Sequence, residues 1–90
     1  MSQKRERNRR QEKKMDNRKK LLSILLEINP DLDYETEAAL VDDGLFDSLE
    51  IMSVVMEIEE RFHTEIDPDD VIAENFNSLE SILKLVEKNQ

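Results

Sequence analysis

The apolar residues of this chain are distributed unevenly, and this distribution limits where a hydrophobic core can form. Only Met1 and Met15 are apolar among the first 20 residues, so nearly all apolar side chains lie in the following 70 residues. The first 20 residues also carry ten basic and three acidic side chains, a formal charge of +7, whereas the rest carries three basic and nineteen acidic ones, a charge of −16. We therefore expect a disordered basic N-terminal extension at residues 1–17 and one small folded domain at residues 18–90.

The composition excludes several kinds of protein. With no Cys and one His, the chain lacks disulfides, cysteine-containing zinc sites and thiol nucleophiles, and it has too few groups for a catalytic triad. A domain of about 70 residues buries only about 60% of its unfolded surface, which leaves little room for a catalytic cleft. The longest apolar stretch, residues 21–28, is interrupted by Ser23 and Glu27, so we expect neither a membrane span nor a secretory signal. A cytoplasmic protein that is not an enzyme is expected.

Two further groups of residues favour structural roles. Acidic side chains gather at Asp67, Asp69, Asp70 and Glu74, but this run lacks the glycine and the glutamate spacing of an EF-hand loop, so no metal site is expected. His63 follows a predicted helix, and we expect it to pack or hydrogen-bond at the end of that helix.

The apolar spacing predicts helices, and no strand pattern competes with them. Residues 21–28 place apolar side chains at i, i+3, i+4 and i+7, which is typical of a core-facing helix, and Asn29-Pro30 ends it. After a long loop at residues 31–47, Asp47 and Glu50 have the spacing of a capping box that opens a second helix. The inner face of this second helix would comprise Ile51, Met52, Val55, Ile58 and Phe62, with Leu49 and Met56 beside it.

Two more helices complete the expected fold. Asp67-Pro68 indicates a turn before a short helix through Val71, Ile72 and Glu74, and Asn77-Ser78 would cap a last helix. The prediction is an all-α protein, a small four-helix bundle with three main helices and one short helix. Its core positions beyond the first helix would include Val55, Ile58, Ile66, Ile72, Phe76, Leu79 and Ile82.

One position offers a group suited to chemistry. Ser48 would be the first residue of the second helix, where its hydroxyl is accessible beside backbone N–H groups that have no helical partner. These donors and the positive end of the helix favour a phosphodiester at this position. The structural alternative is that Ser48 only helps to start the helix.

The residues on both sides of Ser48 form a longer motif. The run Asp43-Gly44-Leu45-Phe46-Asp47-Ser48-Leu49-Glu50-Ile51-Met52 resembles the prosthetic-group site of acyl carrier proteins and related phosphopantetheine-binding domains. Residues 57–70 are similar to the acidic end of the second helix of that family and to its F-x-x-E-I passage into the third. The resemblance covers residues 18–88, and it implies a helical bundle of the acyl-carrier type.

By this resemblance, a phosphopantetheinyl transferase would attach 4′-phosphopantetheine from coenzyme A to Ser48. The thiol of that arm would hold an acyl or aminoacyl group as a thioester, for fatty-acid-like, polyketide or other specialised biosynthesis. Asp47 and Leu49 match the residues beside the attachment serine, and the chain would act as a monomer. The transferase and the loading and pathway enzymes would present basic patches to this chain. The acidic side chains that would dock on these patches are Asp47, Glu50, Glu57, Glu59 and Glu60.

The motif also departs from that of fatty-acid carriers. Those proteins have one residue between the glycine and the Asp-Ser-Leu triplet, whereas Leu45 and Phe46 both follow Gly44 here. Ser53 stands where they have an acid. The Gly-Leu-Phe-Asp-Ser form is closer to D-alanyl carrier proteins, although Leu49 is typical of acyl carriers. A D-alanyl or other aminoacyl carrier is therefore an alternative.

The basic residues 4–20 are not explained by the resemblance. They include no aromatic side chain for base stacking, but their cations can attract phosphate. The alternatives are a solvated tail, a docking tail for a partner, and contact with nucleic acid or an anionic membrane surface. A further alternative is that the functional protein starts at Met15 and the preceding residues are an upstream extension. A second function class is accordingly a helical adaptor with a basic phosphate-binding arm, in which Ser48 only starts a helix.

Overall fold

The computed structural model describes the backbone of residues 2–90 and the side chains of residues 15–90. Within these residues the chain forms α-helices and one 3-10 turn, and no strands. The elements are α1 (Ser2–Ile28), α2 (Ser48–Arg61), the 3-10 turn (Pro68–Asp70), α3 (Ala73–Phe76) and α4 (Leu79–Lys88). The predicted all-α bundle of three main helices and one short helix is confirmed.

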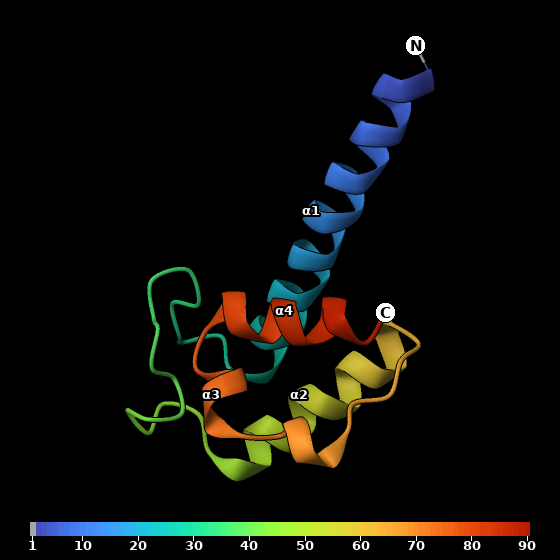
Figure 1. Cartoon of the computed structure of the whole chain (residues 1–90). Coiled ribbons are helices and arrows are strands. Elements are labelled where there is room, and N and C mark those ends of the chain that lie inside the picture. Colours follow the sequence, from blue (N-terminus) through green and yellow to red (C-terminus); the bar gives the residue numbers. More distant parts are fainter. Residues whose placement is uncertain (1) are drawn as a thin grey trace.

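The helices pack around the inner half of α1. α1 packs against both α2 and α4, and α3 packs against α4. The N-terminal end of α1 projects beyond the bundle, so the molecule measures 48 × 26 × 20 Å (Figure 1). None of the helices in the described residues has the length and apolar character that crossing a bilayer requires.

The predicted division between an extension at residues 1–17 and a domain at residues 18–90 falls within α1 and stays a prediction. The contacts of α1 with the bundle reach Asn17, which is buried and whose Nδ2 donates to Gln90 Oε1 at 2.9 Å. The side chains of residues 1–14, to which most of the predicted extension belongs, lie outside the described residues.

α1 forms its part of the core as the spacing predicts. Leu21, Ile24 and Leu25 are fully buried on one face of the helix, and Ile28, the last residue of the predicted set, packs against the same core while only partly buried. The helix ends at Ile28, because Pro30 disfavours a helical conformation at the residue before it.

The sequence prediction for the buried face of α2 is partly wrong. Val55, Ile58 and Phe62 are buried as expected, but Met52 is 49% exposed, and Val54 is fully buried in its place. Leu49 and Met56, expected beside that face, are also exposed. Helical spacing defines a set of neighbouring faces, and the position of α1 decides which of them is covered.

The expected short helix is also corrected. The structure divides this stretch into the 3-10 turn and α3, with Val71 and Ile72 between them. Ile72 is extended, with φ −126° and ψ 156°, and precedes the first residue of α3. Its side chain is therefore 47% exposed instead of buried in the core. The remaining predicted core residues beyond α1 are buried: Val55, Ile58, Ile66, Phe76, Leu79 and Ile82.

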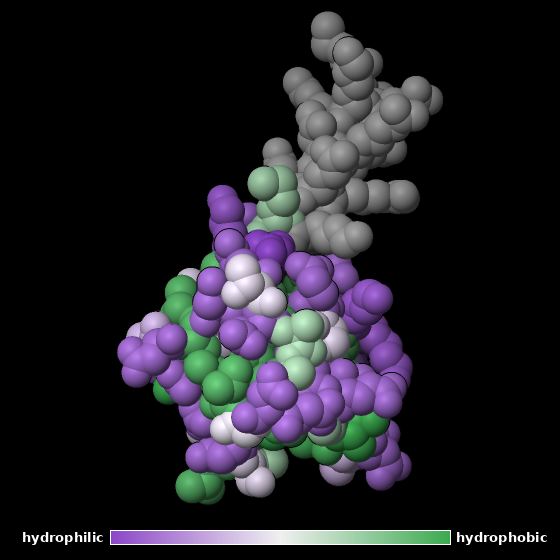
Figure 2. All heavy atoms as spheres, turned by 90° about the vertical axis from the view of Figure 1, so that its left-hand side faces the viewer, coloured by the Kyte–Doolittle hydropathy of each residue, from purple (hydrophilic) through white to green (hydrophobic). Residues whose placement is uncertain are grey.

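The long loop between α1 and α2 is held by buried side chains. The Tyr34 hydroxyl lies 2.9 Å from the carbonyl oxygen of Leu25 and 2.7 Å from that of Asn29, so it contacts the last turn of α1. The Tyr34 ring meets Phe46 edge-on, with the ring centres 5.9 Å apart. Figure 2 shows the side of the molecule on which this loop lies, where hydrophilic residues cover most of the surface and hydrophobic groups form separate patches.

Asn77, just before α4, holds the second half of the loop. Its side-chain oxygen accepts hydrogen bonds from the backbone N–H groups of Val41 and Asp42, both at 3.0 Å. Its backbone oxygen accepts from the N–H of Leu40 at 2.9 Å. The loop therefore leads into α2 from a fixed position, although it contains no helix of its own.

Candidate functional site

The loop makes a tight turn before it enters α2. Gly44 has φ +74°, a left-handed conformation that glycine adopts without strain. The N–H groups of Leu45 and Phe46 both donate to the carbonyl oxygen of Leu40, at 2.8 and 2.9 Å. Because the Phe46 side chain is buried, it anchors the chain immediately before the helix begins.

Asp47 caps α2, and the predicted capping box is confirmed. An Asp47 carboxylate oxygen accepts from the Glu50 N–H at 2.8 Å, and Glu50 Oε1 accepts from the Asp47 N–H at 3.2 Å. Ser48 is thus the first residue of the helix and is not its cap. This arrangement leaves the Ser48 hydroxyl outside the cap.

The side chains of Ser48 and Leu49 are exposed at the start of α2. The N–H groups of a first helical turn have no partners within the helix, and the helix dipole places partial positive charge there. An exposed hydroxyl beside such groups suits a covalently attached phosphate, because the donors and the dipole stabilise its negative charge.

One residue of this site was not predicted from the sequence. Asn29, directly after α1, donates from Nδ2 to Glu50 Oε2 at 2.8 Å. The contact joins residues 21 positions apart, and no periodicity or motif in the sequence indicates it. Tyr34 of the loop was not singled out from the sequence either. Burial, and secondarily the charge of Glu50, raise the pKa of its hydroxyl to about 12.

The four glutamates predicted as a partner-recognition face differ in their surroundings. Glu50 is part of the capping box, and Glu59 Oε2 accepts from the N–H of Ile66 at 3.0 Å. Glu57 Oε2 lies 2.9 Å from Arg61 Nε. Glu60 is exposed. Two of the four carboxylates therefore also bind backbone groups of the fold itself.

A groove opens beside the exposed side of α2. It has a volume of about 450 Å³ and lies between α2 and the segment around the 3-10 turn. Its walls are mainly apolar and consist of Met52, Val55, Glu59, Ile66, Pro68 and Val71.

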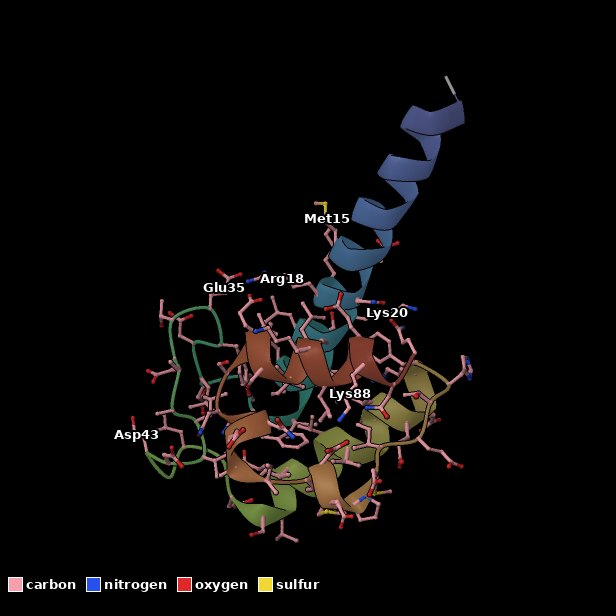
Figure 3. The ribbon with its side chains drawn as sticks, in the orientation of Figure 1. Met15, Arg18, Lys20, Glu35, Asp43 and Lys88 are labelled. Atoms are coloured by element: carbon pink, nitrogen blue, oxygen red, sulfur yellow. The ribbon has the colours of Figure 1, made fainter. Side chains whose placement is uncertain are left out.

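The acidic run after α2 has structural roles. Asp67 accepts from the Asp69 N–H at 2.9 Å and so caps the 3-10 turn, while Asp70 pairs with Lys88 of α4 at 3.3 Å. Figure 3 marks Lys88 on α4. The described residues contain no cluster of three or more metal-ligating side chains. His63 lies just beyond α2 with φ +51°, but its side chain is exposed, so the expected packing at the helix end is wrong.

The last cations of the basic stretch contact the bundle. Arg18 is directed toward Glu35 of the loop (Figure 3), with 3.7 Å between Nη1 and Oε1, and it also reaches Glu80 of α4 at 3.4 Å. Lys20 Nζ lies 5.7 Å from the centre of the Phe62 ring. Lys19 is exposed. The seven other cations proposed to bind phosphate are at positions 4–14, whose side chains lie outside the described residues.

Comparison with known proteins identifies a family and curated relatives. Residues 19–86 match the family described as the phosphopantetheine attachment site. The acyl carrier protein of Buchnera aphidicola subsp. Baizongia pistaciae (strain Bp) is 40% identical over 52 residues, which are 58% of this chain and 64% of that protein. The chain thus covers slightly less than two thirds of this curated relative. No solved structure matches significantly.

Proposed function

Because this chain belongs to the family of domains that carry the phosphopantetheine attachment site, we propose that it is a carrier whose prosthetic group is attached to Ser48. One observation supports this residue above all. Ser48 is an exposed serine at the first position of α2, and the capping role falls to its neighbour Asp47. The hydroxyl can therefore be modified without removing the cap of the helix.

The attachment reaction requires only a nucleophilic oxygen from this chain. Ser48 Oγ attacks the phosphorus of coenzyme A that bears the pantetheine, and the new Oγ–P bond replaces the bond to adenosine 3′,5′-bisphosphate, which leaves. The hydroxyl proton passes to a base on the transferase. Once attached, the arm supplies a thiol that forms thioesters, and the carrier itself contributes a fixed attachment point.

The cargo we propose is an acyl group. The relative from Buchnera is named an acyl carrier protein, and Leu49 follows the attachment serine as in acyl carriers. An aminoacyl cargo such as D-alanine is the alternative. The proposal also includes a role in fatty-acid-like, polyketide or other specialised biosynthesis, a monomeric state and a cytoplasmic location.

The proposed partners are a phosphopantetheinyl transferase and the loading and pathway enzymes, which would present basic patches. Their docking surface would comprise Asp47, Glu50, Glu57, Glu59 and Glu60. Exposed charges of this kind speed encounter and set orientation, and their effect weakens with salt. Glu60 is exposed, whereas Glu59 accepts a hydrogen bond from the backbone of Ile66. We therefore expect charge reversal at Glu60 to weaken docking without lowering stability, and charge reversal at Glu59 to lower both.

The test is incubation of the full chain with coenzyme A and a broad-specificity phosphopantetheinyl transferase, followed by intact mass measurement. We expect a gain of one phosphopantetheine on the wild type and none on Ser48→Ala. Ser53→Ala is the matched control, because Ser53 is an exposed serine on the same helix, and it should be modified like the wild type. An unmodified wild type would contradict the proposal and favour the helical adaptor, and a modified Ser48→Ala would contradict the attachment residue.

A further inference from the structure

We infer that Asn29 is a positioning residue for the modification of Ser48, acting through the Glu50 carboxylate. This inference rests on the proposed function, since it concerns the orientation of the hydroxyl that the transferase would use. Asn29 lies outside α2, yet it donates to Glu50 Oε2 at 2.8 Å. The other oxygen of the same carboxylate, Oε1, accepts from the Asp47 N–H. One carboxylate thus connects the end of α1 to the residue before Ser48.

Each backbone and side-chain polar group of Asn29 makes a hydrogen bond. Its backbone N–H donates to Leu25 O at 2.8 Å, and its backbone oxygen accepts from the Tyr34 hydroxyl at 2.7 Å. Its side-chain oxygen accepts from the Asp31 N–H at 3.2 Å, and Nδ2 donates to Glu50. A donor fixed in this way presents one defined position to the Glu50 carboxylate.

A second contact supports the same junction. Tyr34, which binds the backbone of Asn29, packs its ring against Phe46, and Phe46 precedes Asp47. The charge of the Glu50 carboxylate also contributes to the raised pKa of Tyr34, because the two side chains lie near each other. Polar and apolar contacts therefore both tie the end of α1 to the start of α2.

This junction matters for the reaction because Ser48 is the first residue of its helix. The direction of its Cα–Cβ bond follows the backbone of Asp47 and the first turn of α2, which the capping box fixes. Attack on phosphorus requires a hydroxyl in line with the leaving oxygen, and reactive groups must be held within about 0.5 Å of the productive geometry. Glu50 is only partly buried, so without Asn29 its carboxylate is free to turn toward water and leave the Asp47 N–H.

A pair of reciprocal substitutions tests the inference. Asn29→Asp keeps the shape of the side chain but replaces the donor with a carboxylate that faces Glu50. Adding Glu50→Gln restores a hydrogen bond in the opposite sense, because the Gln amide donates to the carboxylate introduced at position 29 while its oxygen accepts from the Asp47 N–H. We expect kcat of a phosphopantetheinyl transferase for Asn29→Asp to fall about three- to tenfold, comparable with the loss of a helix cap. We expect the KM of Asn29→Asp to change by less than about twofold, and the double variant to recover most of kcat. The KM of the double variant is expected to rise, because Glu50→Gln removes a charge from the proposed docking surface.

Asn89→Ala is the matched control. Asn89 Nδ2 also donates a hydrogen bond near a helix end, but its acceptor is the backbone oxygen of Leu85, at 2.8 Å, and it lies at the C-terminal end of α4. It should lower stability without changing kcat. Amide exchange provides a readout independent of the transferase. The Asp47 N–H, whose acceptor is the Glu50 carboxylate, should exchange faster in Asn29→Asp but not in Asn89→Ala.

Equal kcat for the wild type and Asn29→Asp, or a loss that the double variant does not recover, would overturn the positioning role. Unchanged exchange of the Asp47 N–H would overturn the proposed link to the cap. If the wild type accepts no arm at all, the proposed function fails and the inference fails with it, whereas a wild type and an Asn29→Asp variant modified equally well would leave only the inference wrong.

Discussion

The same three residues, Ser-Leu-Glu, stand at the start of α2 and around the start of α4, and the two helices use them differently. At α4, Ser78 is the cap, and its hydroxyl accepts from the Ser81 N–H at 3.1 Å. At α2, the preceding Asp47 is the cap, and Ser48 is the first helical residue. The leucines that follow differ accordingly, since Leu79 is 1% exposed and Leu49 is 79% exposed.

The residue before each serine explains the difference. Asp47 accepts from the Glu50 N–H, so it occupies the cap position. Asn77 stands in the equivalent place before α4, but its side-chain oxygen already accepts from the N–H groups of Val41 and Asp42. Ser78 therefore caps α4. A shift of one residue at the cap decides whether a serine hydroxyl is bound to the helix or available for chemistry.

The largest expected effect concerns the two leucines. Leu79→Ala removes a buried side chain and should lower the free energy of unfolding by about 3 kcal/mol. Leu49→Ala removes an exposed one and should change it by less than about 0.5 kcal/mol. Chemical denaturation of both variants measures this, and similar losses would contradict the different burial of the two helix starts.

A smaller loss of stability is expected at alkaline pH, from Tyr34 in the loop between α1 and α2. The pKa of Tyr34 is raised from 10.0 to about 12, so the folded protein keeps a proton that the unfolded chain loses above pH 10. Stability from this group is fully present below pH 10 and is lost as pH rises to about 12, by on the order of 2 kcal/mol. Denaturation at pH 9 and pH 11.5 should show this additional loss in the wild type. Tyr34→Phe should lack it, and an equal loss in that variant would assign the effect to other groups.

The caps themselves provide the next comparison. Ser78→Ala and Asp47→Ala should each lower the free energy of unfolding by about 1 kcal/mol, because each removes the side-chain acceptor of a cap. Ser48→Ala should change it by less than about 0.5 kcal/mol, because Ser48 does not cap α2. Thermal or chemical denaturation measures all three, and a loss at Ser48 equal to that at Ser78 would show that the two serines have the same role.

The smallest expected effect lies at the other end of α2. His63 has φ +51°, whereas Asn89 at the end of α4 has φ −99°. The Thr64 N–H donates to Glu59 O, which completes a helix end of the kind that normally uses glycine at this position. His63→Gly should therefore raise stability by about 0.5–1 kcal/mol. Asn89→Gly should lower it, and stabilisation at Asn89 alone would contradict the backbone explanation.

Several features could be predicted from the sequence because they depend on neighbouring residues. The end of α1 at Asn29-Pro30 and the capping box of Asp47 and Glu50 follow from local backbone chemistry. The first helical position of Ser48 follows from the same motif. These interactions join residues at most four positions apart, so the order of residues is sufficient to find them.

Other features depended on which surfaces meet. Met52 and Val54 are two residues apart on α2, and only the packing of the helix shows that Val54 is the buried one. Ile72 is apolar and was expected in the core, but its extended backbone before α3 leaves it partly exposed. Helical spacing could not predict either outcome, because it does not include the position of neighbouring elements.

The sequence by itself determined an all-α carrier domain with an acidic surface and a serine at the start of its second main helix. Periodicity and capping encode helices locally, and the motif around Ser48 is a continuous run of residues. Only the tertiary structure decided that Asn29 reaches Glu50 and that Tyr34 supports both α1 and Phe46. The physical reason is that such contacts form when burial of a common core brings distant segments together. A loop without periodicity has no sequence pattern from which its contact residues could be predicted.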